Sequence, residues 1–214
     1  MSTESGRETD PEQTGTERIG FVQGVQAGLR SWRTVDIVVA AVIGVAVGVV
    51  FWLWNIVWSV TTPLFVAFPP GQAVVYGMWL ISGVLGGLII RKPGAALLTS
   101  IAAASVSAVL GTQWGMQVIL DGALQGILPE LVFLAFAYKR WNMGVAVLAA
   151  AVAGLSPALR DNIVYNVTWP LHYQLTYGVI VVISAALIAG VGARLLTTAL
   201  AKSGALAPFP SAKG

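Results

Sequence analysis

The sequence predicts an all-α, polytopic membrane protein, because charged residues are sparse and are separated by apolar stretches of helix length. Of the 214 residues, 57% are hydrophobic and only 10% are charged, whereas a soluble domain carries about 25% charged residues. No Asp, Glu, Lys, Arg or His occurs from Ile37 to Ile90. A membrane-spanning helix needs about 20 apolar residues, so this stretch holds two spans, and isolated charges divide the remainder into further ones.

Six transmembrane helices are expected between two tails. Residues 1–18 are polar and without apolar periodicity, which predicts a disordered cytoplasmic tail, and residues 19–33 are a candidate interfacial segment. The transmembrane domain is expected at 34–198, and a second cytoplasmic tail at 199–214. The six spans are expected at Val35–Ile56, Ala73–Ile90, Ala95–Leu110, Gly115–Tyr138, Met143–Leu159 and Tyr173–Thr197.

Basic residues set the expected orientation. With six spans, eleven of the twelve Lys and Arg residues fall on one side of the membrane, and only Arg160 falls on the other. Because cytoplasmic loops carry the excess of Lys and Arg, we expect a multi-pass protein of the cell membrane with both termini in the cytoplasm. The net charge of +3 comes from these loops, so it indicates orientation and not nucleic-acid binding.

The expected outer side is almost uncharged and rich in aromatic residues. An interfacial aromatic belt is one explanation, but the cytoplasmic side has far fewer aromatic residues. This imbalance favours a second explanation, in which some outer rings line a pocket for a flat ligand. The candidates for this lining are Trp58, Trp114, Tyr165 and Trp169.

The fourth expected span carries the most specific polar pattern. Trp114, Gln117, Asp121 and Gln125 are spaced i, i+3, i+7 and i+11, which places them on one face of an ideal helix, about 80° wide. A carboxylate within the membrane is costly unless it meets a cation, a donor-rich ligand or water. Asp121 is therefore a candidate ligand-binding residue, and a hydrogen bond to another helix is the alternative.

Two further polar residues are candidate ligand contacts. Glu130 points away from the Asp121 face on an ideal helix, but Pro129 kinks that helix. Glu130 could therefore bind ligand, bridge to a basic residue or contact a partner. Asn162 belongs to the polar segment RDNIVYNVTWPLHYQLTY, which we expect to form a loop between the last two spans.

Small residues on the first span predict a close helix contact. Ala40, Gly44 and Gly48 follow one another at four-residue steps, and such rows let helix backbones approach closely. The row either packs against another helix of this chain or receives another subunit.

Residue types and motifs that the sequence lacks exclude several classes of function. The chain has no cysteine and one histidine, so thiolate metal sites and cysteine nucleophiles are excluded, and we expect no resident metal and no catalytic residue. Without a GxxxxGK[ST] loop the chain cannot hydrolyse ATP by that mechanism. No nucleophile–base pair supports an intramembrane enzyme. A binding subunit whose energy comes from a partner fits these observations best.

Four segments also carry a family resemblance: WRTVDIVVAAVIGVAVGVVFWLWN, GGLIIRKPGAAL, SVSAVLGTQWG and QGILPELVFLAFAYKRW. Together they resemble the YkoE-type family, the substrate-binding S components of energy-coupling factor (ECF) transporters for thiamin or its hydroxymethylpyrimidine precursor. The similarity covers nearly all of residues 32–197 and leaves the tails outside it.

The resemblance implies a partner set as well as a fold. It implies a six-helix S component that assembles with a transmembrane coupling (T) protein and with cytosolic ABC ATPase subunits, which alone use ATP; the S component has no cofactor. It also implies that small residues on the first helix, here Ala40, Gly44 and Gly48, contact the coupling protein, and that the vitamin is held near the outer side.

The candidate residues have the chemistry that a thiamin-like ligand needs. An aminopyrimidine ring needs aromatic walls and hydrogen-bonding partners, and a thiazolium cation is stabilised by a carboxylate and by Trp faces. These groups are available from Asp121, Glu130, Trp58, Trp114, Tyr165, Asn162 and Trp169. The alternatives are an S component for a different vitamin and a structural or assembly subunit of the membrane that binds no ligand.

Overall fold

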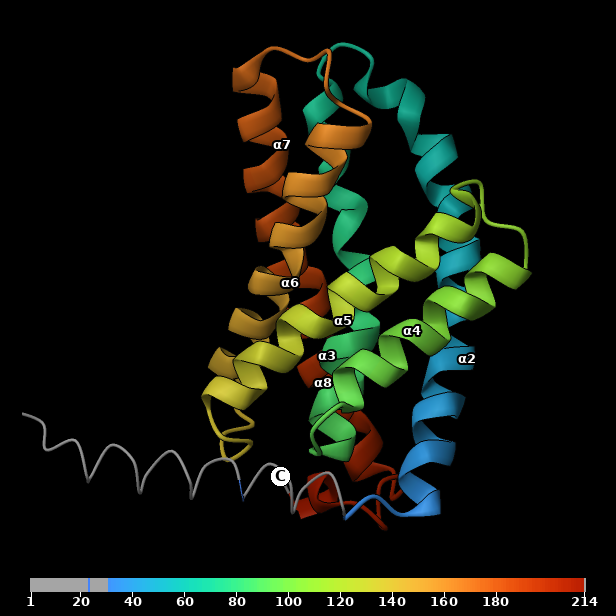
Figure 1. The fold of residues 1–214 in the computed structure, drawn as a ribbon, viewed down its shortest axis with the longest axis vertical. Coiled ribbons are helices and arrows are strands. Elements are labelled where there is room, and N and C mark those ends of the chain that lie inside the picture. Colours follow the sequence, from blue (N-terminus) through green and yellow to red (C-terminus); the bar gives the residue numbers. More distant parts are fainter. Residues whose placement is uncertain (1–22, 24–30, 214) are drawn as a thin grey trace, which may run out of the picture.

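The computed structural model of the chain describes residue 23 and residues 31–213, and these residues are helical without a strand (Figure 1). Five helices are long and apolar enough to cross a membrane, and a sixth apolar helix is shorter. The all-α, polytopic fold is therefore confirmed. The expected tail at 1–18, and the candidate interfacial segment up to residue 30 apart from residue 23, lie outside the described residues.

Each expected span has a helical counterpart, with changed ends and local geometry. The order is α2 (Thr34–Thr61), the 3₁₀ helices η1 (Thr62–Phe65) and η2 (Pro69–Leu80), α3 (Ile81–Ile90), α4 (Ala95–Val109), η3 (Gly115–Gln117), α5 (Val118–Ala135), α6 (Met143–Val164), α7 (Leu171–Ser184), the π-helix η4 (Ala185–Val191), α8 (Gly192–Lys202) and η5 (Pro210–Lys213). Because α6 continues to Val164, most of the expected loop RDNIVYNVTWPLHYQLTY is helical.

The small-residue row of α2 packs inside this chain. Ala40 is fully buried, and a Cβ placed on Gly44 or Gly48 would collide with Ala102, Ala103 or Val106 of α4. The structure thus supports internal packing of this row, because α4 occupies the close approach that the small residues permit. The contact of the row with a coupling protein stays a prediction.

The C-terminal segment does not extend away as a tail. Leu206 and Phe209 are each only 5% exposed, and the Ser211 hydroxyl donates a hydrogen bond of 2.8 Å to the carbonyl of Ile89. Helix α8 also continues to Lys202, beyond the expected end of the last span. The two apolar side chains explain the difference, because they are buried when the segment folds back on the end of α3.

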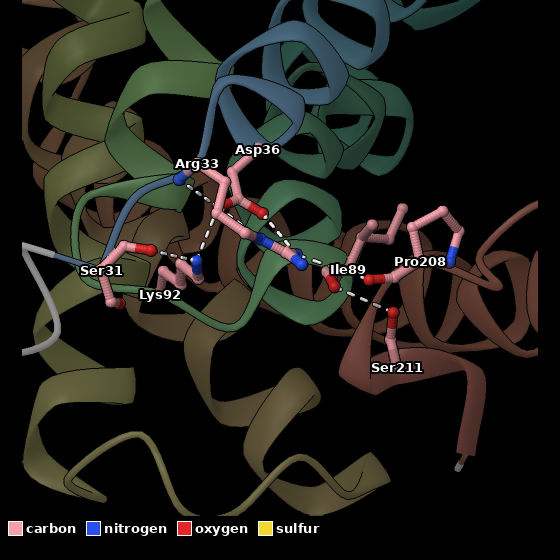
Figure 2. Close-up of polar contacts among 7 residues, drawn as sticks. All are labelled: Ser31, Arg33, Asp36, Ile89, Lys92, Pro208 and Ser211. Carbon is pink, nitrogen blue, oxygen red and sulfur yellow. Dashed lines mark hydrogen bonds and ion pairs between the residues drawn. The ribbon is translucent and has the colours of Figure 1, made fainter.

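A polar cluster fixes the end of the bundle that carries both ends of the described chain (Figures 1 and 2). Asp36 is fully buried and accepts hydrogen bonds from the Arg33 backbone at 2.7 Å and from Lys92 Nζ at 2.6 Å. Lys92 also donates to the carbonyl of Ser31 at 2.6 Å, and Arg33 Nη2 donates to the carbonyl of Pro208 at 3.4 Å. One carboxylate therefore ties the start of α2 to the α3–α4 turn, and through Arg33 to the C-terminal segment.

Replacing this carboxylate should destabilise the bundle without changing the structure of its opposite end. In Asp36→Asn, the charges of Lys92 and Arg33 lose their counter-charge, and we expect a loss of roughly 2 kcal/mol. Thermal unfolding of the detergent-solubilised chain measures this loss. Lys92→Gln is the control with a smaller expected loss, because Asp36 keeps its bonds to Arg33. An unchanged melting temperature in Asp36→Asn would contradict the structural role.

Candidate ligand-binding site

A cavity of about 350 Å³ lies among the helices toward the end of the bundle opposite both ends of the described chain. Its volume falls within the range of about 300–1,000 Å³ that is usual for small-molecule sites. The lining comes from α2, η1, η2, α4, α5, α6, α7 and the loops that join them. It comprises Phe51, Asn55, Trp58, Thr62, Pro69, Gln72, Tyr76, Trp79, Ala104, Ser107, Thr112, Trp114, Val118, Asp121, Gln125, Arg160, Asp161, Tyr165, Asn166, Trp169 and Tyr177.

One wall of the cavity is a set of aromatic rings on η2 and α2. A 3₁₀ helix has three residues per turn, so side chains three apart lie directly above one another. Tyr76 and Trp79 have this spacing, and their ring centroids are 5.2 Å apart. Trp58 of α2 lies 5.2 Å from Trp79 and 6.2 Å from Trp114. These are distances at which aromatic rings attract one another.

Rings from the later helices continue this wall. Trp114 lies 5.7 Å from Tyr165, and Trp169 lies 6.0 Å from Tyr177. Tyr177 in turn lies 6.4 Å from Tyr76 of η2. The aromatic lining therefore draws on helices that are far apart in the sequence.

Hydrogen bonds hold the aromatic wall in place. Trp114 Nε1 donates to Asn55 Oδ1 at 3.2 Å, and Asn55 Nδ2 donates to Thr112 Oγ1 at 3.1 Å. Gln72 Nε2 donates to the carbonyl of Trp58 at 2.8 Å. Each of these residues lines the cavity, so these polar side chains position the rings as well as contributing polar atoms to the lining.

Three charged residues meet in the lining. Arg160 Nε lies 2.9 Å from Asp121 Oδ1, and Arg160 Nη1 lies 3.9 Å from Asp161 Oδ1. The Tyr177 hydroxyl donates to Asp161 Oδ2 at 2.6 Å. Asp121 Oδ1 is buried, and its close contact with Arg160 lacks the alignment of a hydrogen bond. By formal charge, two carboxylates and one guanidinium give the described lining one negative charge in excess.

Six of the nine candidate substrate-binding residues lie together in this lining: Trp58, Trp114, Asp121, Gln125, Tyr165 and Trp169. The structure leaves Gln117, Glu130 and Asn162 outside it. Gln117, the last residue of η3, is exposed. Asn162 Nδ2 instead joins α6 to α7, donating to the carbonyls of Ala158 at 2.8 Å and Gln174 at 2.9 Å.

Glu130 caps α4 and does not line the cavity. Its carboxylate accepts hydrogen bonds from the backbone of Gly94 at 2.7 Å and of Ala96 at 2.9 Å, where a helix start leaves donors without partners. It also accepts from the Tyr138 hydroxyl at 2.5 Å. Burial raises the pKa of that hydroxyl, and the bond to Glu130 raises it further.

Sequence reasoning did not select several of the lining residues, notably Asn55, Gln72, Tyr76, Trp79, Arg160, Asp161 and Tyr177. The charged pair carried a usable signal, because Arg160 is the basic residue on the expected outer side and Asp121 needs a cation there. Tyr76 and Trp79 carried a weaker one, because their three-residue spacing puts them on one helix face without showing that this face lines a cavity.

Comparisons with known proteins agree with this architecture. A family model described as the permease component of an ABC-type cobalt transport system matches residues 35–156. The putative HMP/thiamine permease protein YkoE of Bacillus subtilis (strain 168) is 35% identical over 181 residues, which cover 83% of this chain and 89% of YkoE. A crystal structure of an S-component of an ECF transporter superposes with a TM-score of 0.80 at 34% identity, covering 86% of this chain and 92% of that one.

The cap at Glu130 predicts a change in stability without a change in binding. Glu130→Ala removes the acceptor of two backbone donors and of Tyr138, and we expect a loss of roughly 1–3 kcal/mol with unchanged affinity for a ligand of the cavity. Thermal unfolding and equilibrium binding measure the two quantities. Glu130→Gln, which keeps an acceptor oxygen, should lose less. Retained stability with lost affinity would instead place Glu130 at the ligand.

Proposed function

We propose that this chain, which belongs to the YkoE-type family of S components of ECF transporters, captures thiamin or its hydroxymethylpyrimidine precursor in the aromatic cavity and delivers it for import. The chain is a membrane-embedded transport subunit and not an enzyme. The observation that carries the choice of ligand is the combination of an aromatic lining with one excess negative charge.

The aromatic lining suits the pyrimidine ring that both ligands share. Trp58, Trp79 and Trp114 present flat faces and edges with centroids 5.2–6.4 Å from one another, and heteroaromatic rings stack favourably on such groups. Asn55, Gln125 and Asn166 also line the cavity. Their amides provide donors and acceptors for ring nitrogens and an exocyclic amine.

The charge of the lining distinguishes the two ligands. Thiamin carries a cationic thiazolium, whereas the hydroxymethylpyrimidine is neutral. A cation that approaches Asp121 competes with Arg160, whose 2.9 Å contact is poorly aligned, and it neutralises the excess carboxylate charge. Aromatic faces around it add cation–π attraction. We therefore infer a preference for the cationic ligand that depends on Asp121.

The same proposal includes an orientation and partners. The basic residues Arg33, Arg91, Lys92, Arg194 and Lys202 belong to the end of the bundle that carries both ends of the described chain, and the retention of positive charge in the cytoplasm supports an orientation with that end inside the cell. The cavity then faces the outer side. A T protein and cytosolic ABC ATPase subunits complete the transporter.

The cavity, and not a metal site, supports the proposal. In the described part of the chain, no three His, Cys, Asp or Glu side chains are grouped so that they could hold a metal ion. The name of the matching family model refers to cobalt transport. The described residues do not form a set of ligands for such an ion.

Thermal stabilisation identifies the ligand class. A ligand that binds only the folded chain stabilises it by about 2.7 kcal/mol at 100 times its Kd. We expect thiamin or hydroxymethylpyrimidine to raise the melting temperature of the detergent-solubilised chain, and riboflavin, biotin and pyridoxine to leave it unchanged. A shift with another vitamin would retain the S component and replace the ligand. No shift with any of them would favour a subunit that binds no ligand.

A second prediction concerns the charge of the cavity. Asp121→Asn leaves Arg160 without its nearest carboxylate and removes the excess negative charge, so thiamin affinity should fall about tenfold or more while affinity for the neutral pyrimidine changes far less. Isothermal titration with both ligands measures the difference. Gln117→Ala, on the exposed turn before α5, is the control and should change neither. Equal weakening of both ligands would rule out a cation-pairing role for Asp121.

A further inference from the structure

A second cavity, of about 250 Å³, lies between α8 and the C-terminal segment, at the end of the bundle that carries both ends of the described chain. Its lining includes two basic residues, Arg194 and Lys202, with Thr197, Thr198 and Ser211. None of these residues belongs to the aromatic cavity. The proposed capture of a vitamin therefore leaves this site without a role.

The wall of this cavity is fixed by the fold. Ser211 is anchored by its hydrogen bond to the carbonyl of Ile89, at the end of α3 (Figure 2). Leu206 and Phe209 are buried in the core on the way to it. The C-terminal segment thus holds one side of the cavity against α8, and the cavity is part of the packed structure.

The hydroxyl groups of the lining already donate their protons elsewhere. Thr197 donates to the carbonyl of Ala193 at 2.7 Å, and Thr198 donates to that of Arg194 at 2.9 Å. The Ser211 proton is likewise engaged. The donors that remain for a ligand are the charged groups of Arg194 and Lys202, which are best matched by an anion.

The carboxylates of the described chain do not neutralise these charges. Asp36 pairs with Arg33 and Lys92, Asp121 and Asp161 pair with Arg160, and Glu130 caps α4. Within residues 31–213, no ion pair includes Arg194 or Lys202.

A third basic residue adds to the excess of positive charge. Arg91 donates from Nη1 to the carbonyl of Pro210, next to Ser211, at 3.4 Å, while its Nη2 is buried and has no hydrogen-bond partner among the described residues. Burial lowers the pKa of the Arg91 guanidinium, and the positive charge of Arg194 lowers it further. A buried donor without a partner, and two like charges close to one another, both destabilise the fold unless a counter-ion is bound.

We propose that this cavity is a binding site for a phosphate-bearing anion, held by Arg194 and Lys202 with Arg91 as a supporting charge. Guanidinium groups match phosphate oxygens in geometry as well as in charge. The headgroup of an anionic phospholipid is one source of that phosphate, because basic pockets between membrane helices on the cytoplasmic side recognise such headgroups. Leu195 and Leu196 next to the site are 60% and 42% exposed, which leaves apolar surface for an acyl chain. Free phosphate in solution is the other source.

The test uses the full chain in detergent and follows its thermal stability. It is titrated with phosphatidylglycerol, with phosphatidylcholine, and with sodium phosphate against sodium chloride at matched ionic strength. The double variant Arg194→Gln/Lys202→Gln is compared with Lys139→Gln/Arg140→Gln. The latter pair is the matched control, because it removes two exposed charges from the α5–α6 loop, outside this cavity.

We expect phosphatidylglycerol to stabilise the wild-type chain more than phosphatidylcholine does, with an apparent affinity that falls about tenfold or more in the site variant and less than twofold in the control. Stabilisation by sodium phosphate with the same dependence on Arg194 and Lys202 would identify a free anion as the ligand. Because Lys202 is exposed, Lys202→Gln alone keeps the fold and should give a smaller loss in the same direction. No selective stabilisation, or equal losses in both double variants, would overturn the proposal.

Discussion

A carboxylate within a membrane-spanning helix needs a cation, a set of hydrogen-bond donors or a ligand, because the hydrocarbon around it offers no solvation. The four described carboxylates meet this constraint in three ways. Asp36 forms ion pairs with Arg33 and Lys92. Glu130 accepts hydrogen bonds from backbone donors at the start of α4 and from the Tyr138 hydroxyl. Asp121 and Asp161 share Arg160. Each arrangement ties together segments that are distant in sequence, so much of the tertiary structure follows from these four side chains.

The same constraint separates structural carboxylates from those that suit a ligand. Asp36 and Glu130 receive several well-formed hydrogen bonds each, and a ligand could reach them only by breaking bonds that hold helices together. Asp121 and Asp161 have one guanidinium between them, and Asp121 Oδ1 receives no aligned hydrogen bond. The carboxylate oxygen that lacks a hydrogen-bond donor therefore lies in the aromatic cavity. The opposite imbalance lies at the other end of the bundle around Arg194, where cations have no ion-pairing carboxylate among residues 31–213.

The sequence was sufficient to predict the six helical segments, because their limits are set by where charges are absent, and the membrane imposes that pattern directly. It was less informative about the site. Helix periodicity puts Gln117 on the face of Asp121, but periodicity does not say how far that face extends into a cavity, and Gln117 is exposed. The partners of Glu130 are the backbone donors of Gly94 and Ala96, and backbone donors leave no signal in side-chain chemistry. The packing of Leu206 and Phe209 likewise depends on a surface that only the folded bundle provides.

Beside the aromatic cavity, the backbone departs from the regular α-helix in two elements that pack together. The 12-residue 3₁₀ helix η2 is far longer than the usual three to four residues, and it packs against the start of the π-helix η4. Ser184, at that junction, accepts from the backbone of Gly77 at 2.9 Å and donates to the carbonyl of Val74 at 2.6 Å. A Cβ on Gly77 would collide with the Ser184 carbonyl, so glycine is required there. The contact stabilises the backbone geometry that sets Tyr76 edge-on to Trp79 in the wall of the cavity, with ring centroids 5.2 Å apart.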